Sequence, residues 1–237
     1  MTSQRIDALP ARALGSGKAA AQIEFAGLAL TLDNSGAAFI NSEATLLVAD
    51  LHLEKASRSA AQGRLLPALD SCDTLHRLKR AIEAYNPWRV ICLGDSFDDR
   101  FAGERMAEAD REELAFICAQ AGEWIWLTGN HDPEIPAFCG GETVAEIAIG
   151  GVILCHAPAA NRAAPQIVGH IHPKASVPAG GSRFSGPCFC VSHDLLIMPA
   201  FGAYAGGVSC LTPAIRSLHR SEPKVYMLHA KKIWRVA

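Results

Sequence analysis

Residues 45–50 read TLLVAD, a run of mostly apolar side chains that ends in an acidic residue. Two later segments have the same form, RVICLGD at residues 89–95 and WIWLTGNHD at residues 124–132. Short apolar runs bounded by polar residues are typical of buried strands. Between them, residues 70–85 and 104–120 carry apolar side chains at three- and four-residue spacing, which predicts amphipathic helices. This alternation predicts an α/β fold whose ligand site lies outside the carboxyl ends of the strands.

The second half of the chain continues the pattern and then changes it. VILCH at residues 152–156 and QIVGHIH at residues 166–172 again place histidines at the ends of apolar runs. Beyond them, residues 181–191, 195–199 and 224–228 read as strands joined by turns that contain glycine and proline, without long helices. We therefore expect a second sheet packed on the first.

Size and composition predict one domain. The chain has 237 residues, of which 49% are hydrophobic, so it is long enough for one well-covered core and short for two full-sized domains. Residues 1–20 are rich in Ala, Gly and Ser without a steady period. We expect them to form a loosely ordered lead-in, followed by a single domain over residues 21–237.

The charge balance excludes little. A formal net charge of −2 gives no reason to expect that bulk charge holds the protein to nucleic acid or to an anionic membrane. The basic tail from Arg216 onward fits a patch along a nucleic-acid backbone and a plain surface strand equally well. No stretch approaches the roughly 18 apolar residues that span a bilayer, and the N-terminus lacks a secretory apolar region. These features predict a cytoplasmic protein without a membrane partner.

The eight cysteines lie scattered, with no CxxC pair among them. Free thiols in a reducing compartment explain this distribution better than a disulfide framework does. Cys188 and Cys190 flank Phe189 in a predicted strand, so their side chains would share a face. A zinc site at that point is disfavoured because no second pair accompanies them.

The strand ends supply a mixed set of oxygen and nitrogen ligands. The candidates are Asp50, His52, Asp95, Asn130, His156, His170 and His172. Imidazole together with carboxylate suits Mn, Fe, Zn, Co or Ni better than Ca or Mg. Seven ligands exceed what one ion takes from protein while leaving a position for substrate, so we expect two ions and one bridging carboxylate. Such a pair clamps a phosphoryl group and makes hydroxide available near neutral pH, which favours hydrolysis of phosphate esters.

The ordered motifs D-x-H, G-D, G-N-H-D, a lone His after a strand and G-H-x-H resemble those of the calcineurin-like metallophosphoesterases. The likeness covers about residues 45–173 and implies a four-layer αββα sandwich, with two packed mixed sheets flanked by helices. It also implies how the ligands are shared. Asp50, His52 and His172 would hold one metal, Asn130, His156 and His170 the other, and Asp95 would bridge them. Manganese is our first choice of metal.

The same resemblance implies the catalytic roles. His131 would approach the phosphate and protonate the leaving oxygen after a metal-bridging hydroxide attacks phosphorus, and Asp132 would orient His131. Asn130, His131 and Arg162 are the candidates for contact with substrate. Lys55 and Arg58 also follow a predicted strand end, where a solvated face is the alternative role.

A narrower resemblance extends to about residue 207. LLVADLHLEK, ICLGDSFDD, WIWLTGNHDP, GHIHP and MPAFGAYAGG are similar to the ligase-associated DNA-damage-response endonucleases of the PdeM family. This implies a DNA phosphodiester substrate, a role in DNA repair and a functional link to a DNA ligase. One departure is Asp98, where relatives often carry histidine.

Two other functions stay open. One is a small-molecule phosphohydrolase that acts on nucleotides or nucleotide-sugar pyrophosphates, and the other is a non-catalytic scaffold on the same fold. A scaffold typically shows gaps in the ligand set, whereas this sequence shows none. The oligomeric state is not indicated.

Overall fold

The computed structural model describes residues 17–236. Within them, the first sheet has seven strands in the order β1-β2-β3-β4-β5-β6-β7. The strands are β1 (Ala20–Phe25), β2 (Leu28–Asp33), β3 (Ala38–Ile40), β4 (Thr45–Val48), β5 (Arg89–Cys92), β6 (Glu123–Leu127) and β7 (Glu142–Val144). β1 to β4 pair antiparallel, and β4 to β7 pair parallel. The carboxyl ends of β4, β5 and β6 therefore lie at one edge of the sheet.

The second sheet has nine strands in the described part of the chain. They are β8 (Glu146–Ile149), β9 (Val152–Cys155), β10 (Gln166–Val168), β11 (Pro173–Ala179), β12 (Ser182–Val191), β13 (Leu195–Ile197), β14 (Val208–Ser209), β15 (Lys224–His229) and β16 (Lys232–Arg235). β10 pairs parallel with both β9 and β13, so β9 and β10 also end at one edge. β15 and β16 form a hairpin that joins the sheet through β12.

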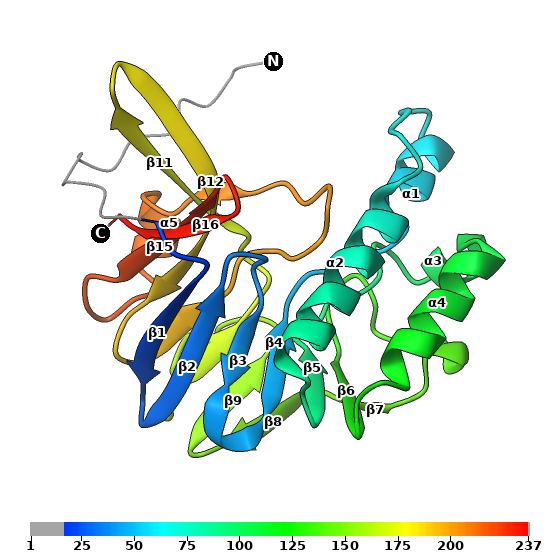
Figure 1. Ribbon diagram of the computed structural model, residues 1–237, viewed down its shortest axis with the longest axis horizontal. Coiled ribbons are helices and arrows are strands. Elements are labelled where there is room, and N and C mark those ends of the chain that lie inside the picture. The colour runs from blue at the N-terminus through cyan, green and yellow to red at the C-terminus, as the bar shows by residue number, and fades with distance from the viewer. Residues whose placement is uncertain (1–16, 237) are drawn as a thin grey trace.

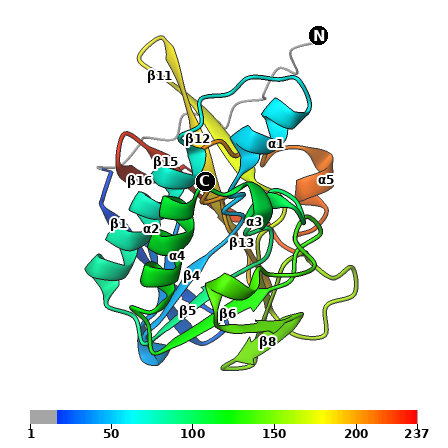
Figure 2. The ribbon, with the colours of Figure 1, turned by 90° about the vertical axis from the view of Figure 1, so that its right-hand side faces the viewer.

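The helices lie mainly on the outer face of the first sheet. They are α1 (Lys55–Ala61), α2 (Asp70–Tyr85), α3 (Ala102–Arg105), α4 (Glu108–Cys118) and α5 (Pro213–Arg216), with short 3-10 turns at Asn41–Glu43 and Ala137–Cys139. α2 and α4 run side by side over this sheet, as Figures 1 and 2 show from two directions. The outer face of the second sheet is covered by α5 and loops, which makes that helical layer thin (Figure 1).

The alternation of side chains along each strand explains how one strand contributes to two hydrophobic cores. On β4, Leu47 packs between the two sheets, whereas Leu46 and Val48 pack under the helices. β5 repeats the arrangement, with Ile91 between the sheets and Val90 on the helix side. Because successive side chains of a strand point to opposite faces, a continuous apolar run fills two cores at once. The predicted α/β sandwich of two mixed sheets flanked by helices is confirmed.

The predicted elements differ from the structure in detail. The helix expected at residues 70–85 is present as α2, whereas that at 104–120 is split between α3 and α4. The split buries Met106, which is 2% exposed, while Arg105 pairs with Asp99. Most of the predicted lead-in, residues 1–16, lies outside the described residues, and Lys18 already pairs with Ile233 ahead of β1. No helix among residues 17–236 has the length and apolar character needed to cross a membrane.

The segment after β13 is fixed to the loop after β4. The backbone N–H of Phe201 donates to Ala49 O at 2.8 Å, and that of Gly202 donates to Asp50 O at 3.1 Å. A Cβ at position 202 would lie 2.2 Å from Leu51 O, so only glycine allows this approach. The close approach of these two loops therefore depends on the absence of a side chain at Gly202.

We predict that Gly202→Ala destabilises the protein by about 2 kcal/mol, because the methyl group forces the two loops apart. Thermal unfolding should show Tm lowered by roughly 4–8 °C. Gly206→Ala is the matched control, since a Cβ there would meet nothing within 4 Å. Equal Tm values for the two variants would contradict the prediction.

Candidate metal centre

The histidines and carboxylates predicted as ligands come together where the two sheets end. Asp50 follows β4, and His170 follows β10 of the other sheet. Both carboxylate oxygens of Asp50 accept the backbone N–H of His170, at 3.0 and 2.9 Å. Asp50 is 0% exposed, so this carboxylate joins the two sheets from within the protein.

One group of side chains consists of Asp50, His52 and His172, whose potential ligand atoms all lie within 4.8 Å of one another. His52 Nε2 lies 3.2 Å from His172 Nε2, which in turn lies 3.4 Å from Asp50 Oδ1. On the opposite side of its ring, His52 Nδ1 lies 3.0 Å from Asp98 Oδ1, in a close contact that lacks the alignment of a hydrogen bond.

A second group contains Asp95, His156 and His170, again within 4.8 Å. His156 Nε2 is its centre: it lies 3.0 Å from His170 Nδ1, 3.3 Å from Asp95 Oδ2 and 3.0 Å from Asn130 Oδ1. The other ring nitrogen, His156 Nδ1, donates to Leu93 O at 2.9 Å. Because that bond takes the proton of neutral His156, Nε2 presents a lone pair to its three neighbours.

These distances fit bound metal. Protein ligands stand about 2.0–2.2 Å from a transition-metal ion, so neighbouring ligands on one ion are roughly 3.0–3.5 Å apart. The contacts of 3.0–3.4 Å within the two groups fall in this range. A cation also resolves the conflict of several lone pairs that face each other. The donor set of both groups therefore fits divalent ions.

The protonation states of Asp95 and His170 in the second group are those that bind a metal. Burial alone raises the pKa of Asp95, but the facing His156 imidazole and the hydrogen bond from the backbone N–H of His131 outweigh it and bring the pKa down to about 2. Asp95 is thus ionised near neutral pH. Burial and the neighbouring His156 both lower the pKa of His170, which keeps that imidazole neutral and available to a metal.

The backbone is strained at the same residues. Positive φ angles occur at Asp50 (53°), His52 (44°), Asp95 (46°), His170 (67°) and His172 (48°). Non-glycine residues seldom adopt this region, which costs of order 1–3 kcal/mol for each one. Strain that recurs at the ligands of one centre indicates a site selected for function rather than for stability.

Steric crowding explains why the G-D motif has a glycine at its first position. Gly94 has a φ of +78°, and a Cβ there would lie 2.5 Å from His156 Nδ1. The loop after β5 therefore passes directly against the ring of a residue from the other sheet. Any side chain at this point would displace His156 from the group.

His131 lies beside these two groups, and with His52 and Asp98 it forms a third group of potential ligand atoms within 4.8 Å of one another. Its Nδ1 donates to Asp98 O at 2.7 Å, and its backbone N–H donates to Asp95 Oδ1 at 2.9 Å. Arg58 Nη1 lies 3.1 Å from His131 Nδ1. His131 Nε2 is 4.0 Å from Asp95 Oδ2, and the side chain is 31% exposed, so this nitrogen faces the open side of the centre.

Asp132 does not orient His131 in the manner expected from the sequence. Its Oδ2 accepts the backbone N–H groups of Ser96 and Phe97 at 2.6 and 3.0 Å, and its Oδ1 accepts that of Gly129 at 3.1 Å. Its carboxylate is fully buried, and burial raises its pKa to about 6. Asp132 ties the loops after β5 and β6 together, and Asp98 O is the group that holds the His131 ring.

Arg162 is not brought to the centre. Its guanidinium pairs with Asp194 at 3.0 Å and also donates to the carbonyl of Leu218. The side chain is 3% exposed. Among residues 17–236, no hydrogen bond or ion pair joins Arg162 to the ligand groups. The expected substrate contact is thus replaced by a structural role, which sequence spacing alone did not reveal.

Asp98 is more central than the sequence suggested. Besides His52, its carboxylate contacts Lys55 Nζ and Arg58 Nη1, each at 3.1 Å. Burial raises the pKa of Asp98, but the close contact with His52 and the hydrogen bond from Lys55 outweigh it and hold the pKa well below its usual range. A permanent negative charge against His52 Nδ1 favours a proton on that nitrogen and leaves Nε2 free as a ligand.

The cysteines are free thiols, as expected. Cys188 and Cys190 share a face with their sulfurs 3.9 Å apart. Cys210 completes a buried group of three thiols within 4.8 Å, a partner from the loop after β14 that strand spacing did not predict.

A family model for calcineurin-like phosphoesterases matches residues 44–174, the stretch that carries most of this geometry. The match covers more than half of the 237 residues, and the chain belongs to this family. It is a metal-dependent phosphoesterase. Among solved structures, the Pseudomonas putida nuclease MPE is similar with a TM-score of 0.71 and 28% sequence identity, over 91% of this chain and 99% of that one. Comparison with curated proteins gives no match.

We predict that Asp98→Ala weakens manganese binding at one of two sites about 10- to 100-fold, because His52 loses the group that sets its ring orientation. Titration of metal-free protein with manganese, followed by electron paramagnetic resonance, measures both sites. Asp99→Ala is the matched control, since the neighbouring carboxylate pairs with Arg105 and Arg58 and lies in neither group. Identical titrations for both variants would contradict the role given to Asp98.

Proposed function

We propose that the protein is a two-metal phosphodiesterase that cleaves DNA. One observation carries the proposal: two groups of carboxylate and imidazole atoms converge at ligand spacing where the ends of two sheets meet. In our assignment, Asp50, His52 and His172 would hold one ion, Asn130, His156 and His170 would hold the second, and Asp95 would serve both.

Two divalent ions held there would supply the polarisation of a phosphoryl group and a source of hydroxide near neutral pH. The residues of the chain keep their ligand atoms in place for this chemistry. Asp50 is held by the backbone of His170, and His156 is held by Leu93 O. Asn130 and His170 are exposed, so the centre opens to solvent on the side where a substrate enters.

His131 is the proposed proton donor to the leaving oxygen. Asp98 O occupies its Nδ1, and Nε2 is left to face the substrate. Histidine side chains change charge near neutral pH, which suits a general acid. Arg58 and Lys55, both bonded to Asp98, place positive charge at the same side of the centre, where phosphate oxygens would lie.

DNA is favoured over a small molecule for two reasons. The similar nuclease is matched over 99% of its length, so its whole fold is present here. Asn130 and His170 of the centre are also exposed, which leaves room for a long substrate. Manganese as the native metal, a role in DNA repair and a functional link to a DNA ligase rest on the sequence resemblance. A gene neighbourhood that contains the ligase is a simple check of the link.

We predict that Asp95→Asn removes activity and lowers the bound metal from two ions to one or none, because one carboxylate serves both sites. Elemental analysis of gently purified protein and a plasmid-nicking assay in manganese test this together. Full activity with two ions retained would refute the assignment of Asp95.

We predict that His131→Ala keeps both metals but slows DNA cleavage about 10²- to 10⁴-fold, the usual contribution of a general acid. The rate with bis(p-nitrophenyl) phosphate should fall much less, because nitrophenolate leaves without a proton. A variant that loses its metals, or that loses both activities equally, would show that His131 has another role.

The small-molecule alternative predicts a different substrate preference for the wild-type protein. Brisk turnover of nucleotides or nucleotide-sugar pyrophosphates in manganese, with no nicking of supercoiled plasmid, would favour it over DNA. Protein that takes up no transition metal would favour the non-catalytic scaffold.

A further inference from the structure

A basic groove leads away from the metal centre along the seam between α2 and the second sheet. It consists of two adjoining cavities of about 220 and 510 Å³. The smaller one is lined by His172, itself a candidate metal ligand, and by Lys174. The two cavities share Arg77, Pro187 and Ala200 in their walls, so one path runs from the ligand to the far cavity.

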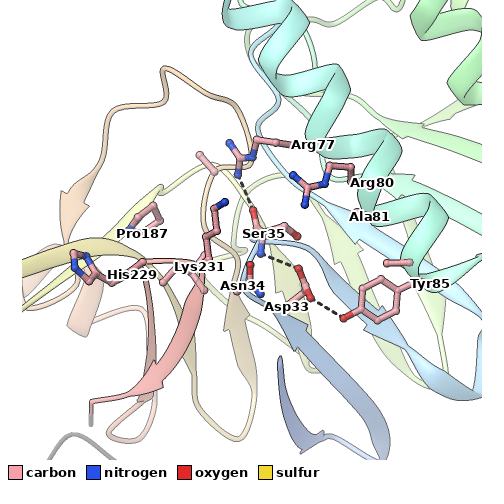
Figure 3. A pocket seen from close by; sticks show the side chains of 14 residues that line it. Asp33, Asn34, Ser35, Arg77, Arg80, Ala81, Tyr85, Pro187, His229 and Lys231 are labelled. Carbon is pink, nitrogen blue, oxygen red and sulfur yellow. Dashed lines mark hydrogen bonds between the residues drawn. The ribbon is translucent and has the colours of Figure 1, made fainter. Parts of the chain in front are cut away.

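The far cavity is shown in Figure 3. Arg77 and Arg80 reach it from α2, and Lys231 reaches it from the opposite side. Asp33 is the acidic residue in its lining, and its carboxylate accepts Tyr85 Oη at 2.9 Å and the backbone N–H of Ser35 at 2.8 Å. The lining is therefore rich in positive charge that its own carboxylate does not neutralise.

Three of these cations have no partner within the described chain. Lys174, Arg80 and Lys231 make no side-chain hydrogen bond or ion pair among residues 17–236, and Arg80 and Lys231 are exposed. Arg77 differs, because it donates to Ser35 O at 2.7 Å and lies over the Phe201 ring. Arg77 forms the wall between the cavities, and the unpartnered cations line the path on either side of it.

The turn that presents Lys231 is strained. β15 and β16 are joined through Ala230 and Lys231, which have φ angles of 50° and 57°. Two-residue turns of this shape normally use Asn or Gly. Neither Ala230 nor Lys231 is of the type that tolerates a positive φ, so the lysine occupies a position where its backbone conformation is unfavourable.

Apolar surface accompanies the charge. Tyr85, Ala81, Pro187 and Leu228 also line the far cavity. Cations that meet phosphates together with apolar walls that meet bases are the combination found in proteins that bind single-stranded nucleic acid. A free phosphate or a mononucleotide would need only the cations near the metals.

We propose that this groove binds a single strand of DNA beyond the scissile phosphate, with Lys174, Arg80 and Lys231 on successive parts of its backbone. The inference rests on the proposed function and adds a binding site that lies outside the metal centre.

The test compares two double variants with equal change in net charge. Arg80→Gln with Lys231→Gln removes two groove cations. Lys79→Gln with Lys232→Gln is the matched control, since Lys79 pairs with Glu113 on the other face of α2 and Lys232 lies over Trp234. The substrates are a single-stranded 20-mer and bis(p-nitrophenyl) phosphate, both in manganese, with Tm measured for each variant.

We expect the groove variant to raise KM for the 20-mer roughly tenfold and to lower the salt dependence of binding by about 1.4 log units per log unit of salt. Hydrolysis of the small diester should be unchanged in both variants, which also shows that both fold. Equal effects of the two variants on the 20-mer, or no effect of either, would overturn the groove while leaving DNA cleavage established. Wild-type protein that hydrolyses the diester but not DNA would instead refute the proposed function.

Discussion

The contact between the Asp50 carboxylate and the backbone N–H of His170 is the constraint on which the centre depends. Asp50 follows β4 of one sheet, and His170 follows β10 of the other. A carboxylate that is 0% exposed needs hydrogen bonds, because an unpaired buried charge is strongly destabilising. The sheets must therefore stay in the register that lets His170 reach Asp50, and this register also sets the positions of His52, His156 and His172.

Strain and metal binding are linked through the same residues. Asp50, His52, Asp95, His170 and His172 all hold left-handed backbone conformations. The packed core between the sheets over-determines these loops, as the approach of Gly94 to His156 illustrates. Part of the folding free energy is thus spent on preorganising ligands. Metal ions that bind the folded chain but not the unfolded chain would stabilise the fold by mass action.

The sequence predicted which side chains come together at the ends of the two sheets, because each candidate ligand follows a buried strand. Asp50, Asp95 and His156 are recognisable from the apolar runs before them, and parallel strands bring their ends to one edge. The partners of those ligands could not be predicted in the same way. Asp98, Asp132 and Arg162 have similar positions in sequence, in loops after strands, yet only Asp98 contacts a ligand side chain. The direction of a loop side chain depends on tertiary packing, which local spacing does not encode.

The same reasoning explains why bulk charge was uninformative about substrate. A net charge of −2 averages over the whole surface, whereas a nucleic acid responds to the field along its own path. Arg80 and Lys231 are 151 residues apart in sequence. Arg80 lies on α2 and Lys231 lies in the turn between β15 and β16, yet both line one cavity. Asp98 contacts the His52 ring on the side opposite His172, and it holds Lys55 and Arg58 there. Cations thus lie on two sides of the candidate ligands. Under the proposed function, a polyanion that crosses the centre would meet positive charge before and after the cleaved bond, whereas a mononucleotide would use one side alone.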